Sequence, residues 1–285
     1  LAFAPVRAWA GQFLGLFRVQ QITILPIDPT RLSTLAGDQT FGDHLGQLVS
    51  DSVKITREGG EARDVATLAE ASQLAGFTVR ELTTTLSGPR ISVQPGTAFE
   101  LVINRDRAQA LLDGAGYSDL QLPRSVDGAT ISVDIPTGVS LAYGDCPQGA
   151  PSDGESVAED FASNCVIFAQ IPSPTVNAPP DLDVAKLAQI GMQVMGMSPD
   201  EAAAFSRTVD WTSTLVVPIP RNGGSYAQVP VDGVTGNLIW RYADDGVPQH
   251  FALMWVKNGV VYALGGYGDR WMALPEDEYK LAKLR

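Results

Sequence analysis

Apolar and polar side chains alternate along this chain with two different periods, and each period predicts one type of element. Residues 52–58 carry Val53 and Ile55 on one face, with the alternation of a half-buried β-strand, and residues 19–27 are a further apolar strand that ends at Asp28 and Pro29. Residues 63–77 carry apolar side chains every three or four positions, which predicts an amphipathic helix. From Trp211 onward the strand period prevails. We therefore expect an α+β fold in which antiparallel sheets are packed with helices.

The predicted helices begin and end at capping residues. We expect Asp64 to cap the first of them and Gly76 to end it in a left-handed conformation. Asn104 precedes a second helix over residues 105–116. The strongest signal is the sequence Ser-Pro-Asp-Glu at residues 198–201, which combines an N-cap, a proline at the first helical position and the glutamate of a capping box.

Two hairpins are predicted from turn residues that separate apolar runs. Residues 251–266 are expected to fold about Asn258 and Gly259, because an Asn-Gly pair suits a type I′ turn with two positive φ angles. This hairpin is so rich in large apolar side chains that we expect it to build core. Residues 129–146 are expected to turn at Pro136, since proline suits a strand end better than a central ladder position.

Residues 171–183 form a Pro-rich connector, because four of these thirteen positions are prolines. Proline suits neither a mid-helix nor a mid-strand position, so the segment is expected to be extended and to mark a boundary. Two lobes are expected to meet there. They are an N-terminal α+β lobe over residues 19–171 and a C-terminal α+β lobe over residues 172–285, the latter with a helical hairpin and the terminal β-hairpin.

Residues 1–18 precede the first strand and are expected to form an amphipathic helix. Its apolar side chains recur at helical spacing and are Phe3, Val6, Trp9, Phe13, Leu16 and Phe17. One interpretation packs this helix on the body of the protein. The other makes it the membrane-proximal continuation of a transmembrane segment or signal that lies outside this sequence. The sequence itself has no uninterrupted apolar run of about 20 residues that could span a bilayer.

Composition narrows the classes of function. The 285 residues are 45% hydrophobic and 18% charged, a balance typical of globular proteins with a sizeable core. The formal net charge of −12 repels phosphate backbones. We therefore expect no nucleic-acid partner.

The two cysteines indicate the compartment. Cys146 follows one strand-like segment, Cys165 precedes another, and a polar loop over residues 147–164 separates them. If the two strands pair, the thiols face each other across the base of that loop, and a disulfide there would contribute on the order of 3 kcal/mol. Two unrelated buried thiols are the alternative. A disulfide would place the chain in an extracytoplasmic compartment.

Residue types suited to catalysis or metal binding are sparse. His44 and His250 are the only histidines, and neither stands in a triad motif. The sequence also has no Gly-x-Ser-x-Gly elbow, no zinc motif and no phosphate loop. We therefore expect no enzyme activity, no catalytic residue, no metal and no cofactor. A hydrolase built on two acidic residues stays open as a third hypothesis, because the separation of carboxylates depends on the fold.

A helix over residues 184–197 carries a markedly apolar face. The face consists of Leu187, Ile190, Met192, Val194, Met195 and Met197. Flexible thioethers adapt to irregular partners, so this face is a candidate surface for an apolar ligand, with the helix as a lid over a groove. Alternatively, the same side chains belong to the core.

Several stretches of the chain resemble an uncharacterised bacterial family of extracytoplasmic domains. They are residues 4–32, 101–116, 209–220, 229–240 and 252–266. In that family the domain follows the transmembrane helix of proteins of the anti-sigma-factor type. The resemblance implies a location outside the membrane, a tether through a segment outside this sequence and no transferable catalytic residue. The cytoplasmic, often zinc-binding portion of such proteins has no counterpart here, since this chain has no Cys/His cluster.

Two hypotheses of function follow. The first is an extracytoplasmic sensory or regulatory domain of a membrane-anchored, anti-sigma-factor-like protein, which binds a ligand or a protein partner without catalysis. The second is a carrier or binding protein for a lipid or another apolar molecule. A continuous apolar cavity of several hundred Å3 under residues 184–197 would favour the carrier. A filled core at that place would favour the regulator.

Overall fold

The protein has an α+β fold, as predicted, with antiparallel sheets and five α-helices in the part of the chain that the structure describes. The computed structural model describes residues 16–28, 30, 39–84, 86–146, 165–221, 224–241 and 250–267. The helices are α3 (Gln39–Ser52), α4 (Leu68–Ala75), α5 (Arg105–Gly114), α6 (Val184–Val194) and α7 (Pro199–Thr208), with a short 3-10 helix, η1 (Arg124–Val126).

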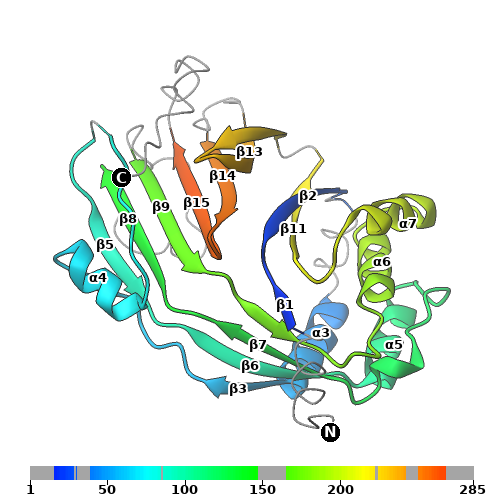
Figure 1. Cartoon of the computed structure of the whole chain (residues 1–285). Helices are drawn as coiled ribbons and strands as arrows, with labels where there is room; N and C mark the ends of the chain where they lie inside the picture. The colour runs from blue at the N-terminus through cyan, green and yellow to red at the C-terminus, as the bar shows by residue number, and fades with distance from the viewer. Residues whose placement is uncertain are drawn as a thin grey trace, which may run out of the picture.

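Two antiparallel sheets form one curved surface (Figure 1). The larger sheet, in spatial order, consists of β12 (Ser225–Val231), β13 (Val234–Arg241), β14 (His250–Lys257), β15 (Val260–Tyr267), β9 (Cys165–Pro172), β8 (Gly138–Gly144), β5 (Arg90–Gln94) and β4 (Arg63–Val65). The smaller consists of β1 (Leu16–Arg18), β10 (Thr175–Asn177), β7 (Thr130–Ile135), β6 (Thr97–Val102) and β3 (Val53–Arg57). A separate parallel pair consists of β2 (Gln21–Ile27) and β11 (Thr214–Pro220).

The two antiparallel sheets are continuous because three strand paths run through both of them. β5 continues into β6 across residues 95–96, β7 into β8 across residues 136–137, and β9 into β10 across residues 173–174. Neighbouring paths stay paired on both sides of the bend, since β6 and β8 pair with β7 and β5, and β10 and β9 pair with β7 and β8. Each bend contains a proline, which cannot donate to a ladder. The sheet therefore turns a corner there.

The predicted hairpin over residues 129–146 is wrong. β7 pairs with β6 and β10, and β8 pairs with β5 and β9, so the two halves of the expected hairpin are not partners. Pro136 ends the ladder as predicted, but the chain bends there and does not reverse. The neighbouring path, from β5 to β6, bends beside it. Gly96 packs so closely at that point that a Cβ on it would lie 2.7–2.8 Å from backbone atoms of Pro136 and Thr137.

The parallel pair of β2 and β11 lies between the larger sheet and the helices α6 and α7 (Figure 1). One side of β2 contacts β13 and β14, where the buried Asn237 side chain donates a hydrogen bond to the Ile22 carbonyl at 2.8 Å. On the other side, Leu25 packs against Met192 of α6 and Ala202 of α7. This pair therefore joins the sheet to the helical hairpin.

The predicted division into lobes over residues 19–171 and 172–285 does not separate the sheets. β15 pairs with β9 in the larger sheet, and β10 pairs with β7 in the smaller one. β11 pairs with β2 in the parallel sheet. Each sheet thus combines strands from both sides of the predicted boundary. The connector over residues 171–183 is not a linker, because it contains β10.

The largest hydrophobic core lies between the larger sheet and α4. At its centre Phe168, Trp255 and Tyr262 are stacked, with ring centroids 5.2–5.9 Å apart. These rings come from β9, β14 and β15, so the terminal hairpin over residues 251–266 builds core as predicted. Its Asn-Gly turn has the two expected positive φ angles, 52° and 73°.

Most of the predicted helix ends are confirmed. Gly76 ends α4 with a φ of 74°, the Asn104 side chain caps α5, and Ser198 forms the capping box of α7. The prediction for Asp64 is wrong. It lies in β4, and Thr67 caps α4 in its place.

The predicted helix over residues 1–18 is wrong at residues 16–18, which are the part of it that the structure describes. Leu16 and Phe17 lie in β1, because the chain there pairs with β10. The other expected membrane-proximal side chains lie outside the described residues, and they are Phe3, Val6, Trp9 and Phe13.

The predicted disulfide between Cys146 and Cys165 is present. β8 and β9 pair with each other, and the disulfide joins them at the end of their ladder, where Gly144 faces Cys165. It closes a loop with a sequence separation of 19 residues. A crosslink of this loop length stabilises a folded chain by about 3 kcal/mol.

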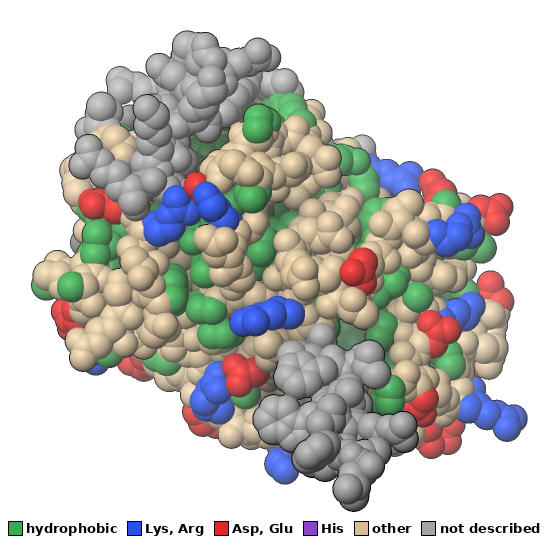
Figure 2. Space-filling view, in the orientation of Figure 1, with side chains coloured by type: hydrophobic (Ala, Val, Ile, Leu, Met, Phe, Trp, Pro, Cys, Tyr) green, Lys and Arg blue, Asp and Glu red, His purple; other side chains and the backbone are tan. Residues whose placement is uncertain are grey.

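Charged side chains are unevenly distributed over the face seen in Figure 2. They gather at the right of the view, over the region of α5, α6 and α7, whereas the sheet side shows mainly hydrophobic and uncharged atoms. Among the residues that the structure describes, no helix is both long enough and apolar enough to cross a membrane.

Candidate functional site

A cavity lies where one strand changes its partner. Phe17 of β1 stands directly opposite Val176 of β10. Arg18 is still in register with Thr175 of β10, but its N–H already donates to the Thr212 carbonyl at 3.1 Å, and the Gln20 N–H then donates to a carbonyl just before β11 at 2.8 Å. The chain then continues as β2 beside β11. The strands β10 and β11 therefore diverge on either side of it and leave a space between them.

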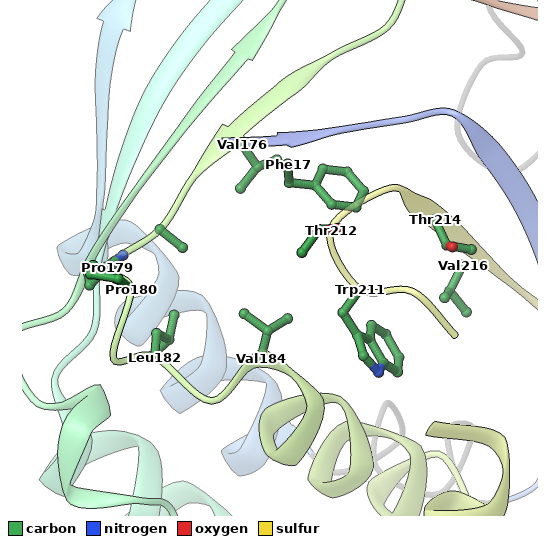
Figure 3. Close-up of a pocket in the computed structure, with 11 residues that line it drawn as sticks. Phe17, Val176, Pro179, Pro180, Leu182, Val184, Trp211, Thr212, Thr214 and Val216 are labelled. Carbon is green, nitrogen blue, oxygen red and sulfur yellow. The ribbon is translucent and has the colours of Figure 1, made fainter. Parts of the chain in front are cut away.

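The cavity has a volume of about 440 Å3. Figure 3 shows Phe17 and Val176 on one side, the residues leading into α6 on a second, and those around Trp211 on a third. The complete lining is Phe17, Val176, Ala178, Pro179, Pro180, Leu182, Val184, Trp211, Thr212, Thr214 and Val216. The space is thus bordered by segments that lie far apart in the sequence, and it is partly open to solvent.

Local sequence signals position two of these walls. Pro179 and Pro180 begin a turn after β10, which is closed by a hydrogen bond from the Leu182 N–H to the Pro179 carbonyl at 3.0 Å. Asp183 then caps α6 by accepting a hydrogen bond from the Lys186 N–H at 2.9 Å. Because the helix begins at this cap, Leu182 and Val184 are held at the cavity, as Figure 3 shows. The Pro-rich sequence is therefore a wall of the site and not a boundary between lobes.

The lining is uncharged, and its polar side chains already have partners. The Trp211 indole N–H donates to the Ser206 carbonyl at 3.1 Å. The Thr212 hydroxyl donates to Asp210 at 2.6 Å, and the Thr214 hydroxyl accepts a hydrogen bond from the Gln21 side chain at 2.9 Å. A ligand in the cavity therefore meets apolar surface, with these polar groups engaged by the protein itself.

The carboxylate of Asp210, which directly precedes the lining residue Trp211, is also engaged by the protein. Hydrogen bonds from the hydroxyls of Thr212 and Ser213 and from the Thr212 N–H hold the pKa of Asp210 below its ordinary value. The cluster fixes the turn before β11. Asp210 is not part of the lining.

The predicted apolar ligand surface on residues 184–197 does not line the cavity. Ile190 and Met192 are 4% and 2% exposed, and Met192 packs in the core against β2. Met195 and Met197 pack against the same core, and Leu187 packs against the core beneath η1. Val194 is half-buried, and its carbonyl accepts a hydrogen bond from the Tyr117 hydroxyl at 3.2 Å. The cavity lies at the opposite, N-terminal end of this helix.

Sequence reasoning missed most of the lining because it comes from three separate segments. The helical spacing of Phe17 favours a membrane-proximal helix, and the prolines around residues 176–182 favour an extended connector. The pattern of residues 211–216 indicates only a strand. No periodicity in the sequence indicates that these three segments come together in the folded protein. The one available signal was the run of prolines directly before a helix cap, which marks a rigid, apolar stretch.

A second notable cluster contains charged side chains from three chain segments. Asp232, in the turn between β12 and β13, accepts hydrogen bonds from Arg80 and from Lys257 of β14. The Arg80 guanidinium also lies over the Tyr262 ring, 5.5 Å from its centroid. The Asp232 side chain is 10% exposed. This cluster joins the segment after α4 to the terminal strands and lies away from the cavity lining.

Two further searches, for a metal site and for similar proteins, do not narrow the class of function. In the described stretches, no group of three or more His, Cys, Asp or Glu side chains is arranged to hold a metal ion. Comparisons of the chain with protein-family models, with curated proteins and with solved structures found no match.

Proposed function

We propose that this chain is an extracytoplasmic binding domain for an apolar molecule, and that the cavity between β1, β10, β11 and the start of α6 is its binding site. The single observation that carries the proposal is the cavity itself. Its volume of about 440 Å3 falls within the roughly 300–1,000 Å3 of small-molecule pockets. The domain acts by binding and performs no bond-making chemistry.

The lining defines the class of ligand. A charged group placed against these walls would lose its hydration and gain no partner, which is costly. A hydrocarbon group instead gains about 25 cal/mol for each Å2 of apolar surface removed from water. The buried part of the ligand is therefore an uncharged hydrocarbon chain or ring, such as the apolar portion of a lipid.

The proposed location outside the cytoplasm has two supports. The disulfide between Cys146 and Cys165 is compatible with an oxidising compartment. The resemblance of several stretches to extracytoplasmic domains of anti-sigma-factor-like proteins agrees with it. In the full-length protein the domain would be tethered to the membrane through residues that precede β1.

A second candidate function is the sensory or regulatory domain of a membrane-anchored, anti-sigma-factor-like protein. Two observations favour it. The core at residues 187–197 is filled, which is the outcome expected for the regulator. Phe17 lines the cavity and belongs to β1, the strand at the end of the expected membrane-proximal segment over residues 1–18. A tethered regulator needs such a connection between its ligand site and its tether, whereas a carrier does not. Both candidates use the same site.

Binding of N-phenyl-1-naphthylamine, an uncharged fluorophore, tests the proposed site. We expect saturable binding by the purified chain and a loss of affinity of at least tenfold in Val184→Trp, which places an indole in the cavity. Val184 is 39% exposed, so the larger side chain leaves the helix cap intact. Val49→Trp is the matched control, because Val49 is an exposed helical valine on α3 that does not line the cavity.

Two results would contradict the assignment. One is the absence of saturable fluorophore binding by the unsubstituted chain. The other is an equal loss of affinity in both valine variants, which would place the fluorophore elsewhere. Thermal unfolding of each variant checks that both remain folded.

A further inference from the structure

We infer that a ligand in the cavity holds β1 in place, so that ligand binding and the docking of this strand on β10 are coupled. The inference rests on the proposed function and adds a mechanism of regulation at the same site. It follows from three features of β1, namely its short ladder, the position of its Phe17 side chain in the cavity lining and its hydrogen bond to the opposite wall.

β1 has little backbone pairing to hold it. It is a three-residue strand at the end of the smaller sheet, and its ladder consists of three register pairs with β10. Edge strands of this length are easily displaced, because few ladder hydrogen bonds offset the entropy of ordering the chain. Side-chain contacts therefore decide how firmly β1 is docked.

Phe17 supplies those contacts, and it supplies them at the cavity. It is the residue of β1 in the described lining, and it stands beside Val176 in Figure 3. The Phe17 ring is half-buried, and its face toward the cavity makes fewer dispersion contacts than a fully packed side chain. A hydrocarbon ligand provides them. The neighbouring Arg18 is exposed and does not line the cavity.

Backbone contact links β1 to the far wall as well. The Arg18 N–H donates to the carbonyl of Thr212, which is itself a lining residue, at 3.1 Å. If β1 leaves β10, Phe17 and this hydrogen bond leave together, and the cavity loses one wall. The ligand therefore binds the docked state more tightly than the undocked state. By linkage, ligand binding must shift the equilibrium toward the docked state by the same factor.

Hydrogen exchange of the β1 amides, with N-phenyl-1-naphthylamine as the probe, tests this inference. We expect saturating probe to slow exchange in residues 16–18 by at least tenfold, measured by mass spectrometry on the intact chain. β3 is the internal control, because it is the other edge strand of the same sheet and contributes nothing to the lining. Exchange in residues 53–57 should not change.

Two variants separate the side-chain link from the backbone. Phe17→Ala should weaken probe binding by about tenfold, a typical coupling between sites, and should abolish the probe-dependent slowing. Arg18→Ala should retain both effects, since that side chain is exposed and is not among the lining residues.

The outcomes distinguish the inference from the proposed function. If the probe binds the unsubstituted chain but exchange in residues 16–18 does not change, the inference is wrong and the binding site stands. If the probe does not bind at all, the proposed function fails and the inference fails with it. Should Phe17→Ala not fold, the exchange comparison on the unsubstituted chain still decides.

Discussion

At the scale of single residues, Asp232 shows how one carboxylate holds three distant segments together. Its backbone has a φ of 53°, a conformation that aspartate tolerates better than most residues. Burial alone would raise the pKa of Asp232, but the hydrogen bonds from Arg80 and Lys257 outweigh burial and hold this pKa below its ordinary value. The carboxylate therefore stays ionised in the folded protein.

Replacing Asp232 by asparagine should destabilise the protein by about 2 kcal/mol, because it leaves two partly buried cations without their counter-ion. Asparagine keeps the size of the side chain and the tolerance for positive φ. Asp134→Asn is the control, since Asp134 forms a similar two-bond pair with Arg57 on the surface. For Asp134→Asn the loss of unfolding free energy should stay below about 1 kcal/mol. Urea unfolding at neutral pH measures both, and equal losses would contradict the prediction.

The lowered pKa of Asp232 also predicts a dependence of stability on pH. A carboxylate whose folded pKa lies below its unfolded value stabilises the folded state fully above that unfolded value. The stabilisation is lost as the pH falls from the ordinary pKa of 3.8 through the lower folded pKa. When the pH is lowered from neutral to below 4, the Asp232→Asn variant should therefore lose less unfolding free energy than the unsubstituted chain. Parallel acid-unfolding curves for the two proteins would refute this.

At the scale of elements, the bends of the three strand paths decide the architecture. Each bend lets one path serve both sheets, and neighbouring paths bend together so that their ladders stay paired. Gly96 makes this close fit possible at the bend opposite Pro136 and Thr137. A local proline signal predicts that a ladder stops, but it does not distinguish a bend from a reversal. That choice depends on the neighbouring strand.

Gly96→Ala should destabilise the protein by about 2–3 kcal/mol, because the new methyl group meets backbone atoms that cannot move independently. Gly88→Ala is the matched control. A Cβ on Gly88 would contact nothing within 4 Å, so that variant should be close to neutral. Thermal or denaturant unfolding compares them, and a neutral Gly96→Ala would show that the bend relaxes freely.

The disulfide gives a second prediction for the β8–β9 element. The double variant Cys146→Ser/Cys165→Ser should lose about 3 kcal/mol of unfolding free energy, since the unfolded chain regains the freedom of the closed loop. Treatment of the unsubstituted chain with a reductant should produce a similar loss. Guanidinium unfolding measures both. A double variant as stable as the oxidised parent would exclude a stabilising role for the crosslink.

At the scale of the whole molecule, long-range strand pairing makes the chain one folding unit. β2 pairs with β11, and the carbonyl of Ile22 accepts a hydrogen bond from Asn237, 215 positions further along the chain. The cavity depends on the same pairing, because it opens where the segment from β1 to β2 changes its partner from β10 to β11. The binding site is therefore a property of the assembled sheets.

Separate fragments covering residues 1–171 and 172–285 should not fold independently, because each lacks partners for strands in all three sheets. The intact chain should unfold in one cooperative transition. Circular dichroism and calorimetry of the two fragments and the parent measure this. A cooperative melting transition in either isolated fragment would restore the division into two lobes.

The sequence by itself determined the features that depend on neighbouring residues. The strand and helix periods predicted the α+β class, and the caps at Asn104 and Ser198 and the Asn-Gly turn were confirmed. The pairing of Cys146 with Cys165 was confirmed as well. Each of these rests on interactions within a few residues or within one hairpin, where the order of residues leaves little choice.

Only the tertiary structure decided the rest. A strand period shows that one face is buried, but it does not name the surface that covers it. The pairing of β2 with β11, the bend at Pro136 and the core position of Met192 all depend on partners far along the chain. The cavity depends on them too, since its walls meet only after the sheets have assembled. Long-range pairing therefore determines the candidate site, and local pattern does not.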